Sequence, residues 1–225
     1  MNSLISDILF GFTGLISIIN PLGVAFVFYD RTAALTESER RQIARRVAVN
    51  AFVVLLVAFF AGAPVLHFFG ISIEALRIGG GLAVAVAGWQ MLNAPDMQTA
   101  GTRHDAAHLN AEAASSKAFF PLTVPLTTGP GAIATAIALT ANRASHKLPT
   151  FLLSAVSSVV ISVLVMAAIY LIYSRAARLA HYLGVAGTRV ALRVSSFLLL
   201  CIGVQIILTG VEGFLAPIVS AHGAG

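Results

Sequence analysis

Charged residues and cysteine are scarce in this sequence, and their scarcity excludes several classes of protein. Only 10% of the 225 residues are charged and 58% are hydrophobic, whereas soluble domains carry about 25% charged residues. The single cysteine, Cys201, excludes an internal disulfide and a cysteine-based metal cluster. The sequence also has no Ser-His-Asp set and no metal-ligand spacing, so we expect no enzymatic activity, no bound metal and no cofactor.

Long apolar runs, in contrast, recur along the whole chain, and its mean hydropathy is +0.90. Six runs are long enough to cross a bilayer core of roughly 30 Å. They cover residues 4–29, 47–69, 73–93, 118–141, 150–173 and 190–210. The sequence therefore predicts an all-α polytopic membrane protein with six transmembrane helices, embedded in the lipid bilayer.

Lysine and arginine are distributed unevenly among the connections between these runs. Of the fourteen in the chain, the second and fourth connections hold three: Arg77, Arg143 and Lys147. The first, third and fifth hold the others: Arg31, Arg40, Arg41, Arg45, Arg46, Arg103, Lys117, Arg175, Arg178, Arg189 and Arg193. Positive loops stay in the cytoplasm, so we expect both termini outside, which is periplasmic in a Gram-negative host. The net charge of +5 then reflects cytoplasmic loops, and we expect no nucleic-acid binding.

Two connections have recognisable features. Thr36 is followed three residues later by Glu39, the pattern of a capping box, so the second helix is predicted to begin well before the membrane. The polar stretch 94–117 has no periodicity and is predicted to be a cytoplasmic loop. It separates a first three-helix repeat, residues 1–93, from a second, residues 118–225.

The two halves of the chain resemble each other. "INPLGVAF" in the first run has a counterpart in "TGPGAIAT" in the fourth, with Pro21 matching Pro130. "ALRIGGG" from Ala75 matches "ALRVSSF" from Ala191, and residues 88–90 match residues 203–205. Each half has three crossings, an odd number, so the second half enters from the opposite side. We therefore expect two inverted three-helix repeats, an arrangement that transporters use.

Both matching motifs place helix-breaking residues inside an apolar run. Asn20 is a strong N-cap residue and Pro21 is the preferred first residue of a helix, and Gly129 with Pro130 has the same character. The first and fourth helices are therefore predicted to be broken near mid-membrane, with two half-helix N-termini converging there. Free amides beside free carbonyls suit a zwitterion. The alternative is a pair of plain proline kinks with no ligand.

The predicted substrate-binding residues are Asn20, Pro21, Gly23, Thr127, Thr128, Gly129, Pro130 and Gly131. Small side chains among them leave room for a small solute, and the hydroxyls add neutral hydrogen-bonding groups. Gln90 and Gln205 either line a path or bond between helices. Near the outer surface, ion pairs are expected rather than a gate for Asp7, Glu74, Arg77 and Glu212. The coupling ion stays open, as does whether the glycines at 79–81 pack within one chain or between two copies.

The motifs resemble those of the MarC family, also called the neutral amino acid transporter family, which is related to the LysE superfamily. "INPLG" in the first run, "PLTVPLTTGPGAI" in the fourth, six spans and the polar central loop carry the resemblance, which covers nearly the whole chain. It implies an inner-membrane protein that moves small neutral amino acids such as glycine or alanine. The positions carried over are Asn20, Pro21, Gly23, Pro125, Gly129, Pro130 and Gly131.

The sequence thus favours a transporter or exporter of a small neutral or zwitterionic solute, acting by alternating access around the two broken helices. One alternative is a non-transporting membrane scaffold or assembly factor. A thiol-redox carrier is disfavoured, because Cys201 lies in the sixth run and away from both breaks.

Overall fold

The computed structural model describes residues 2–32, 35–93, 118–141 and 148–222, and every regular element in this part of the chain is helical. The helices are α1 (Asn2–Ile19), α2 (Pro21–Arg31), α3 (Glu37–Phe68), α4 (Ile73–Leu92), η1 (Ala118–Thr127), α6 (Pro130–Ala141), α7 (Leu148–Tyr173) and α8 (Ala176–His222). The predicted all-α class is therefore confirmed for the described part. The predicted loop at 94–117 lies outside the described residues.

Five helical stretches are long and apolar enough to cross a membrane. They are Leu4–Tyr29, Glu37–Phe68, Ile73–Leu92, Phe151–Tyr173 and Ala186–Ala216. The predicted fourth span, residues 118–141, is divided instead between η1 and α6, and the apolar helix Pro130–Thr140 is too short to qualify alone. The described chain is thus a polytopic membrane protein by length and composition, with five such stretches where the sequence predicts six.

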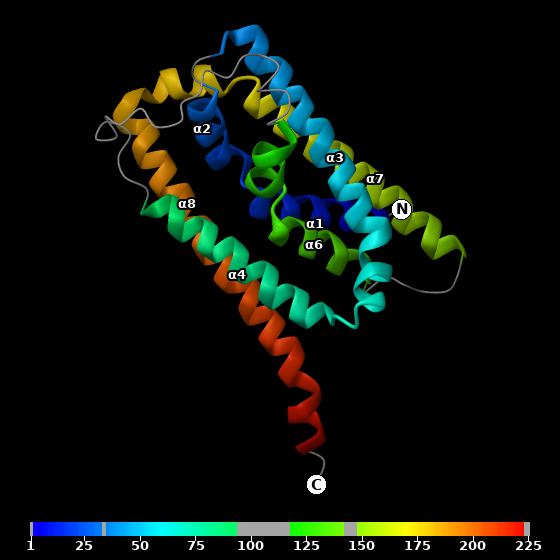
Figure 1. Ribbon diagram of the computed structural model, residues 1–225. Helices are drawn as coiled ribbons and strands as arrows, with labels where there is room; N and C mark the ends of the chain where they lie inside the picture. Colours follow the sequence, from blue (N-terminus) through cyan, green and yellow to red (C-terminus); the bar gives the residue numbers. More distant parts are fainter. Residues whose placement is uncertain (1, 33–34, 94–117, 142–147, 223–225) are drawn as a thin grey trace.

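The long helices form two outer pairs, with the short helices between them. Figure 1 shows α3 beside α7 on one side and α4 crossing α8 on the other, while α1, α2, η1 and α6 lie between the pairs. The apolar core lies where the short helices meet α3 and α7. Its fully buried side chains include Leu15, Phe28, Leu55 and Val165.

Helices α4 and α8 touch backbone to backbone because glycines line their contact. A Cβ atom at Gly81 would lie 2.7 Å from the carbonyl oxygen of Gly203, and one at Gly88 would lie 2.9 Å from that of Ser196. Real Cβ atoms do not approach so closely, so only glycine fits these positions without moving a helix. Small residues allow this close approach in membrane helix pairs.

The three glycines at 79–81 have different surroundings. A Cβ at Gly80 would lie 2.9 Å from the Cβ of Ala134 in α6, Gly81 faces α8, and nothing lies within 4 Å of such an atom at Gly79. Two of the three therefore serve contacts within one chain, which answers part of the question that the sequence left open.

The predicted capping box at the start of α3 is confirmed. Thr36 N donates to Glu39 Oε2 at 2.8 Å, and Glu39 N donates to Thr36 Oγ1 at 3.4 Å. The backbone N–H groups of Thr36 and Glu39 therefore both have an acceptor. As a result α3 begins at Glu37, before the predicted apolar run that starts at residue 47.

Helix α8 is longer than its predicted span in both directions. It runs over 47 residues, Ala176–His222, and is interrupted at Gly184, whose φ is 64°. Glycine adopts this left-handed region at little cost. The segment before Gly184 changes direction there, so the predicted span at 190–210 is the middle of a kinked element.

Candidate functional site

A single residue, Asn20, forms the junction between α1 and α2. Its φ is 44°, the one positive value among the described non-glycine residues, and asparagine tolerates this region. Asn20 N donates to the carbonyl of Ile16 at 2.9 Å, which completes α1. Asn20 Oδ1 accepts from Gly23 N at 3.3 Å, which caps α2. The same residue therefore closes one helix and begins the next.

The start of α2 packs closely on α8. Asn20 Nδ2 donates to the carbonyl of Ser195 at 3.4 Å. A Cβ at Gly23 would lie 2.5 Å from the Cβ of Ser195. The glycine therefore permits the approach of α8, and the asparagine side chain fixes it.

The second junction follows a π-helix, η1, and consists of Thr128 and Gly129. Pro121 and Pro125 have no N–H groups, so they cannot donate the bonds of an ordinary α-helix. The chain uses wider, five-residue spacing instead: Thr128 N donates to the carbonyl of Thr123 at 2.7 Å. Thr128 itself is fully buried.

Two amides at the start of α6 have local partners. Ala132 N and Ile133 N donate to the carbonyl of Gly129 at 3.0 and 3.2 Å, and Pro130 has no N–H. A Cβ at Gly131 would collide with the Val84 side chain of α4. The first turn of α6 is therefore covered by its own backbone and by α4.

Tyr173 connects the second junction to α2. Its hydroxyl lies 3.0 Å from Thr127 Oγ1, and both groups are buried. Its ring stacks on Phe28 of α2, with 4.7 Å between centroids. Tyr173 thus links η1, α2 and the end of α7.

We expect Tyr173→Phe to cost about 1 kcal/mol of unfolding free energy, the typical contribution of one buried hydrogen bond. Thermal denaturation of the purified protein in detergent measures this loss. Tyr182→Phe is the control, because that side chain is 86% exposed, and its melting temperature should equal that of the wild type. Equal losses in both variants would contradict a structural role for the Tyr173 hydroxyl.

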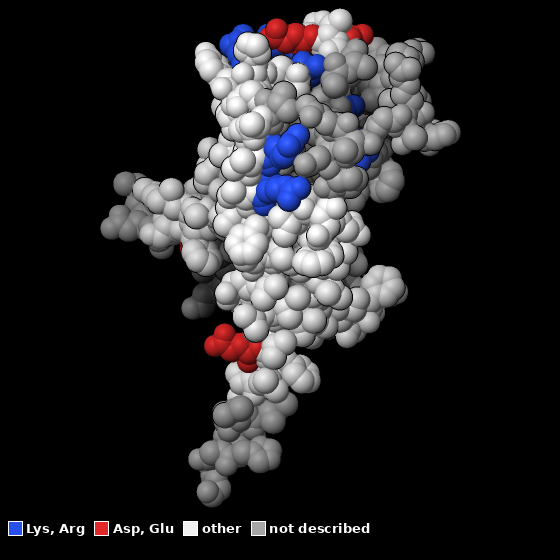
Figure 2. All heavy atoms as spheres, turned by 90° about the vertical axis from the view of Figure 1, so that its left-hand side faces the viewer, with Lys and Arg blue, Asp and Glu red and all other residues white. Residues whose placement is uncertain are grey.

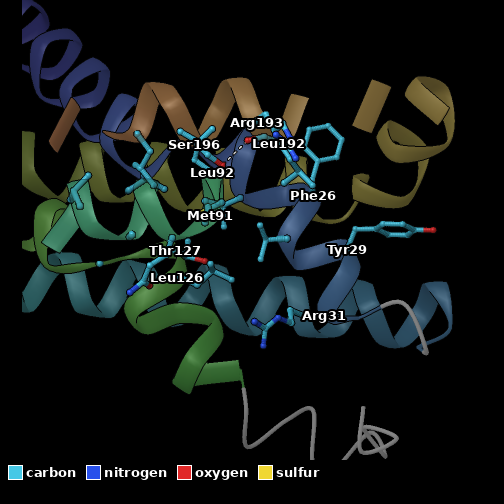
Figure 3. Close-up of a pocket in the computed structure, with 18 of the residues that line it drawn as sticks. Phe26, Tyr29, Arg31, Met91, Leu92, Leu126, Thr127, Leu192, Arg193 and Ser196 are labelled. Atoms are coloured by element: carbon cyan, nitrogen blue, oxygen red, sulfur yellow. Dashed lines mark hydrogen bonds between the residues drawn. The ribbon is translucent and has the colours of Figure 1, made fainter. Parts of the chain in front are cut away.

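A cavity of about 1060 Å³ lies against the second junction and against the last turn of α1, directly before the first junction. Ile18 and Ile19 at the end of α1, with Thr127, Gly129 and Pro130 of the second junction, form one end of it. Helices α2, α4 and α8 form the walls, as Figure 3 shows. Two breaks that are distant in sequence therefore border one common space.

Three of the eight predicted site residues line this cavity: Thr127, Gly129 and Pro130. The other five, Asn20, Pro21, Gly23, Thr128 and Gly131, are not among its lining residues. Asn20 and Pro21 lie directly after Ile19, which does line it. Thr128 Oγ1 is buried with no hydrogen-bond partner among the described residues.

Sequence reasoning missed the arginines of the cavity, because it assigned Arg31, Arg189 and Arg193 to cytoplasmic loops. The cavity lining includes Arg31, His181, Arg189 and Arg193, and among its described lining residues there is no Asp or Glu. In Figure 3, Arg31 comes from α2 and Arg193 from α8. Residues 189, 193 and 196 are spaced by four and by three, so on a helix their side chains lie on one face. This spacing was the signal that could have placed them together.

Arg40 of α3, also read from the sequence as a loop cation, is 8% exposed and caps the end of α2. Its Nε donates to Thr32 Oγ1 at 3.2 Å, and its Nη2 donates to the carbonyls of Thr32 and Leu35, each at 3.0 Å. The guanidinium also lies 5.0 Å from the ring centroid of Tyr29. A cation at a helix C-terminus is favourable, because the carbonyls there carry partial negative charge.

Comparison with known proteins agrees with this architecture. Residues 5–215 match the sequence model of a family described as MarC family integral membrane protein. The chain belongs to the MarC family. It is 32% identical over 206 residues to the UPF0056 inner membrane protein MarC of Escherichia coli K12, covering 89% of this chain and 92% of the relative.

The protein of the same name from Salmonella typhimurium LT2 is 32% identical over 216 residues, covering 94% of this chain and 96% of the relative. No solved structure matches the chain. Membership of the family and the five apolar stretches make this chain an integral membrane protein, and the names of its relatives place them in the inner membrane.

Proposed function

We propose that this MarC-family protein is an inner-membrane transporter or exporter of a small neutral or zwitterionic solute, such as glycine or alanine. The observation that carries the proposal is the cavity of about 1060 Å³, which is bordered by the second junction and by Ile18 and Ile19, the last two residues before the first junction. Non-helical backbone at membrane depth is stable only where protein buries it or a water-filled cavity meets it. Two junctions at one cavity are therefore a natural place for a solute to bind between alternating states.

Reciprocal helix contacts support the inverted repeats, with α1 to α4 as one repeat and η1 to α8 as the other. A two-fold axis requires a counterpart for every contact. Helix α4 packs on α6, and its counterpart α8 packs on α2. Likewise α3 packs on η1 and α6, while α7 packs on α1 and α2. In this arrangement η1 and α6 together make the fourth of six crossings.

The same reciprocity holds between individual residues at the contact of α4 with α8. Gly203 lies 115 positions after Gly88, and Leu200 lies 115 positions after Ala85. A Cβ at Gly88 would lie 2.5 Å from Leu200 N, and a Cβ at Gly203 would collide with Ala85 N. Each contact is therefore the image of the other.

A second reciprocal pair lies at the junctions. Gly80 of α4 packs on the start of α6, where its Cβ would lie 3.4 Å from the carbonyl of Pro130. Ser195 of α8 lies 115 positions later, one position off the match of Ala75 with Ala191, and packs on Gly23 at the start of α2. The two junctions thus have matching neighbours.

Charge distribution supports the proposed orientation, with both termini outside. In Figure 2 the visible Lys and Arg side chains lie in the upper half of the molecule. In Figure 1 that end carries the start of α3 and the turn from α7 to α8. A cytoplasmic location of this end follows from the positive-inside rule. With this orientation, the large cavity, which reaches Arg31 at the end of α2, would open toward the cytoplasm.

Filling the cavity is expected to stop transport. Ala87 of α4 lines the cavity, and Ala87→Trp would place an indole between the walls. We expect the wild-type protein in liposomes to exchange labelled alanine or glycine, and the variant to show only background exchange. The matched control is Leu82→Trp on the same helix, a position that is 56% exposed and is not a lining residue.

Two results would contradict the proposal. Wild-type exchange that persists unchanged in Ala87→Trp would exclude this cavity as the path. No exchange of either solute by correctly folded wild-type protein would favour the alternative, a non-transporting membrane scaffold.

A further inference from the structure

The large cavity has more space than the proposed small solutes need. Its volume of about 1060 Å³ lies just above the range of about 300–1000 Å³ that is typical of cavities for drug-sized ligands. Glycine or alanine at the junctions would therefore leave most of this space unfilled. The side chains around the remaining space indicate which class of molecule fits it.

The end of the cavity at the junctions is apolar. It is formed by side chains from five helices: Ile18, Val24, Val84, Leu122 and Leu199. Two hydroxyls in the lining already have acceptors, because Thr127 Oγ1 donates to the carbonyl of Leu122 and Ser196 Oγ donates to the carbonyl of Leu192, each at 2.7 Å. This end therefore suits a hydrocarbon chain, whose removal from water is favourable.

The opposite end of the cavity is polar and lies at the boundary of the membrane. Phe26, Tyr29 and Arg31 line the cavity in this order along α2 (Figure 3). The apolar stretch that can span the membrane ends at Tyr29, two residues before Arg31. On α4 such a stretch ends at Leu92, two residues after the lining residue Gln90. Lipid headgroups lie at this level of a bilayer, so Arg31 is placed beside them.

Arg31 is available to a ligand. Its side chain is exposed, and within the described part of the chain no side-chain hydrogen bond or ion pair includes it. The described lining residues include no Asp or Glu that would compete for it. Arg189 and Arg193 line the same cavity, but each already has an interaction within the protein. They are therefore not counted as ligands of a headgroup.

The cavity also meets the lipid-facing surface of α4. Val86 is one of its lining residues. Leu82, Val86 and Trp89 are spaced by four and by three, so they share one face of α4, and all three are exposed. An exposed apolar face of a membrane-spanning helix contacts acyl chains. An acyl chain can therefore enter the cavity from the bilayer beside Val86.

We propose that the large cavity binds an anionic phospholipid, with one acyl chain among the apolar side chains near the junctions and the phosphate at Arg31. The lipid fills the space that a small solute leaves free. With the orientation proposed above, Arg31 lies at the cytoplasmic leaflet, whose anionic lipids attract basic residues. Binding of the lipid does not depend on the proposed transport function.

Three probes separate the contributions of headgroup charge and acyl chain. They are phosphatidylglycerol, phosphatidylcholine with the same acyl chains, and glycerol 3-phosphate, which has no chains. A ligand that binds the folded state raises the melting temperature. We expect phosphatidylglycerol to raise the melting temperature of the detergent-purified protein more than phosphatidylcholine does at equal concentration. Glycerol 3-phosphate should have no effect, and native mass spectrometry should show phosphatidylglycerol retained on the protein.

Arg31→Gln tests the headgroup contact. We expect it to weaken binding of phosphatidylglycerol about fivefold, the attraction that one basic residue near the membrane surface supplies. Binding of phosphatidylcholine should stay unchanged. The matched control is Arg45→Gln, which removes the same charge from an exposed residue of α3 that does not line the cavity. That variant should bind phosphatidylglycerol like the wild type.

Ala87→Trp tests the position of the acyl chain. Ala87 lines the cavity, and an indole there would occupy the space of the chain, so we expect the retained phosphatidylglycerol to be lost. Leu82→Trp, on the lipid-facing side of the same helix, should retain it. Both positions are exposed, so neither change overpacks the protein core.

Equal stabilisation by the two phospholipids would overturn the headgroup assignment, since bulk lipid contact has no preference for charge at Arg31. Equal stabilisation by glycerol 3-phosphate and phosphatidylglycerol would indicate a site for free phosphate instead of a lipid. Unchanged phosphatidylglycerol binding in Ala87→Trp, or equal losses in Arg31→Gln and Arg45→Gln, would place the lipid outside this cavity. Each of these outcomes is independent of whether the protein exchanges alanine or glycine.

Discussion

Replacing Gly203 with valine is expected to lower the unfolding free energy by about 3 kcal/mol, the upper part of the range for overpacking. A Cβ there would collide with Ala85 N and lie 2.7 Å from the carbonyl oxygen of Gly81. Both obstacles are backbone atoms, which cannot move aside by a rotamer change. Helices α4 and α8 would have to separate, and the contact at Gly88 would be lost with them. Thermal denaturation in detergent measures the effect.

The matched control for this variant is Gly79→Val on α4. It makes the same chemical change where nothing lies within 4 Å of the added Cβ, and its melting temperature should stay close to that of the wild type. If both variants melt alike, the close contact of α4 with α8 is not what stabilises this pair.

The second large effect is expected for Arg40→Met, with a loss of about 3 kcal/mol from removing charge-assisted hydrogen bonds in a buried setting. The thioether fills part of the space but donates no hydrogen bond. It would leave the carbonyl of Leu35 and the hydroxyl of Thr32 without the donors that Arg40 supplies. Arg40→Lys should not rescue the loss, because an ammonium cannot reproduce the planar fork of donors.

Arg41→Met on the next residue provides the control. Arg41 is exposed and pairs with Glu37 one turn earlier at 2.9 Å, and such surface pairs contribute about 0.5 kcal/mol or less. Chemical or thermal unfolding should therefore separate the two variants clearly. A similar small loss in both would show that the buried guanidinium does not hold the end of α2.

Local signals in the sequence were sufficient to predict much of the fold. The apolar runs predicted the long helices, because length and hydropathy alone define a candidate span. Thr36 and Glu39 predicted the start of α3, since a capping box depends only on residues three apart. The junction at Asn20 could also be predicted from the local sequence. Asparagine both tolerates a positive φ and caps a helix, so one residue carries both signals.

Most of what surrounds the junctions could not be predicted in this way. Arg40 and Arg193 looked like loop residues, yet Arg40 is buried against the end of α2 and Arg193 lines the large cavity. The kink at Gly184 depends on how α8 packs, and glycine also occurs in straight membrane helices. The cavities themselves arise from the spaces between several helices, for which a single run of residues carries no signal.

The glycine contact between α4 and α8 also bears on how the two halves can move. Where side chains interlock, tilting one helix against another requires many rotamers to change together. At Gly81, Gly88 and Gly203 the nearest atoms across the contact are mostly backbone atoms. In the proposed transporter, such a smooth crossing would serve as a pivot on which one half rocks against the other while the point of contact stays in place.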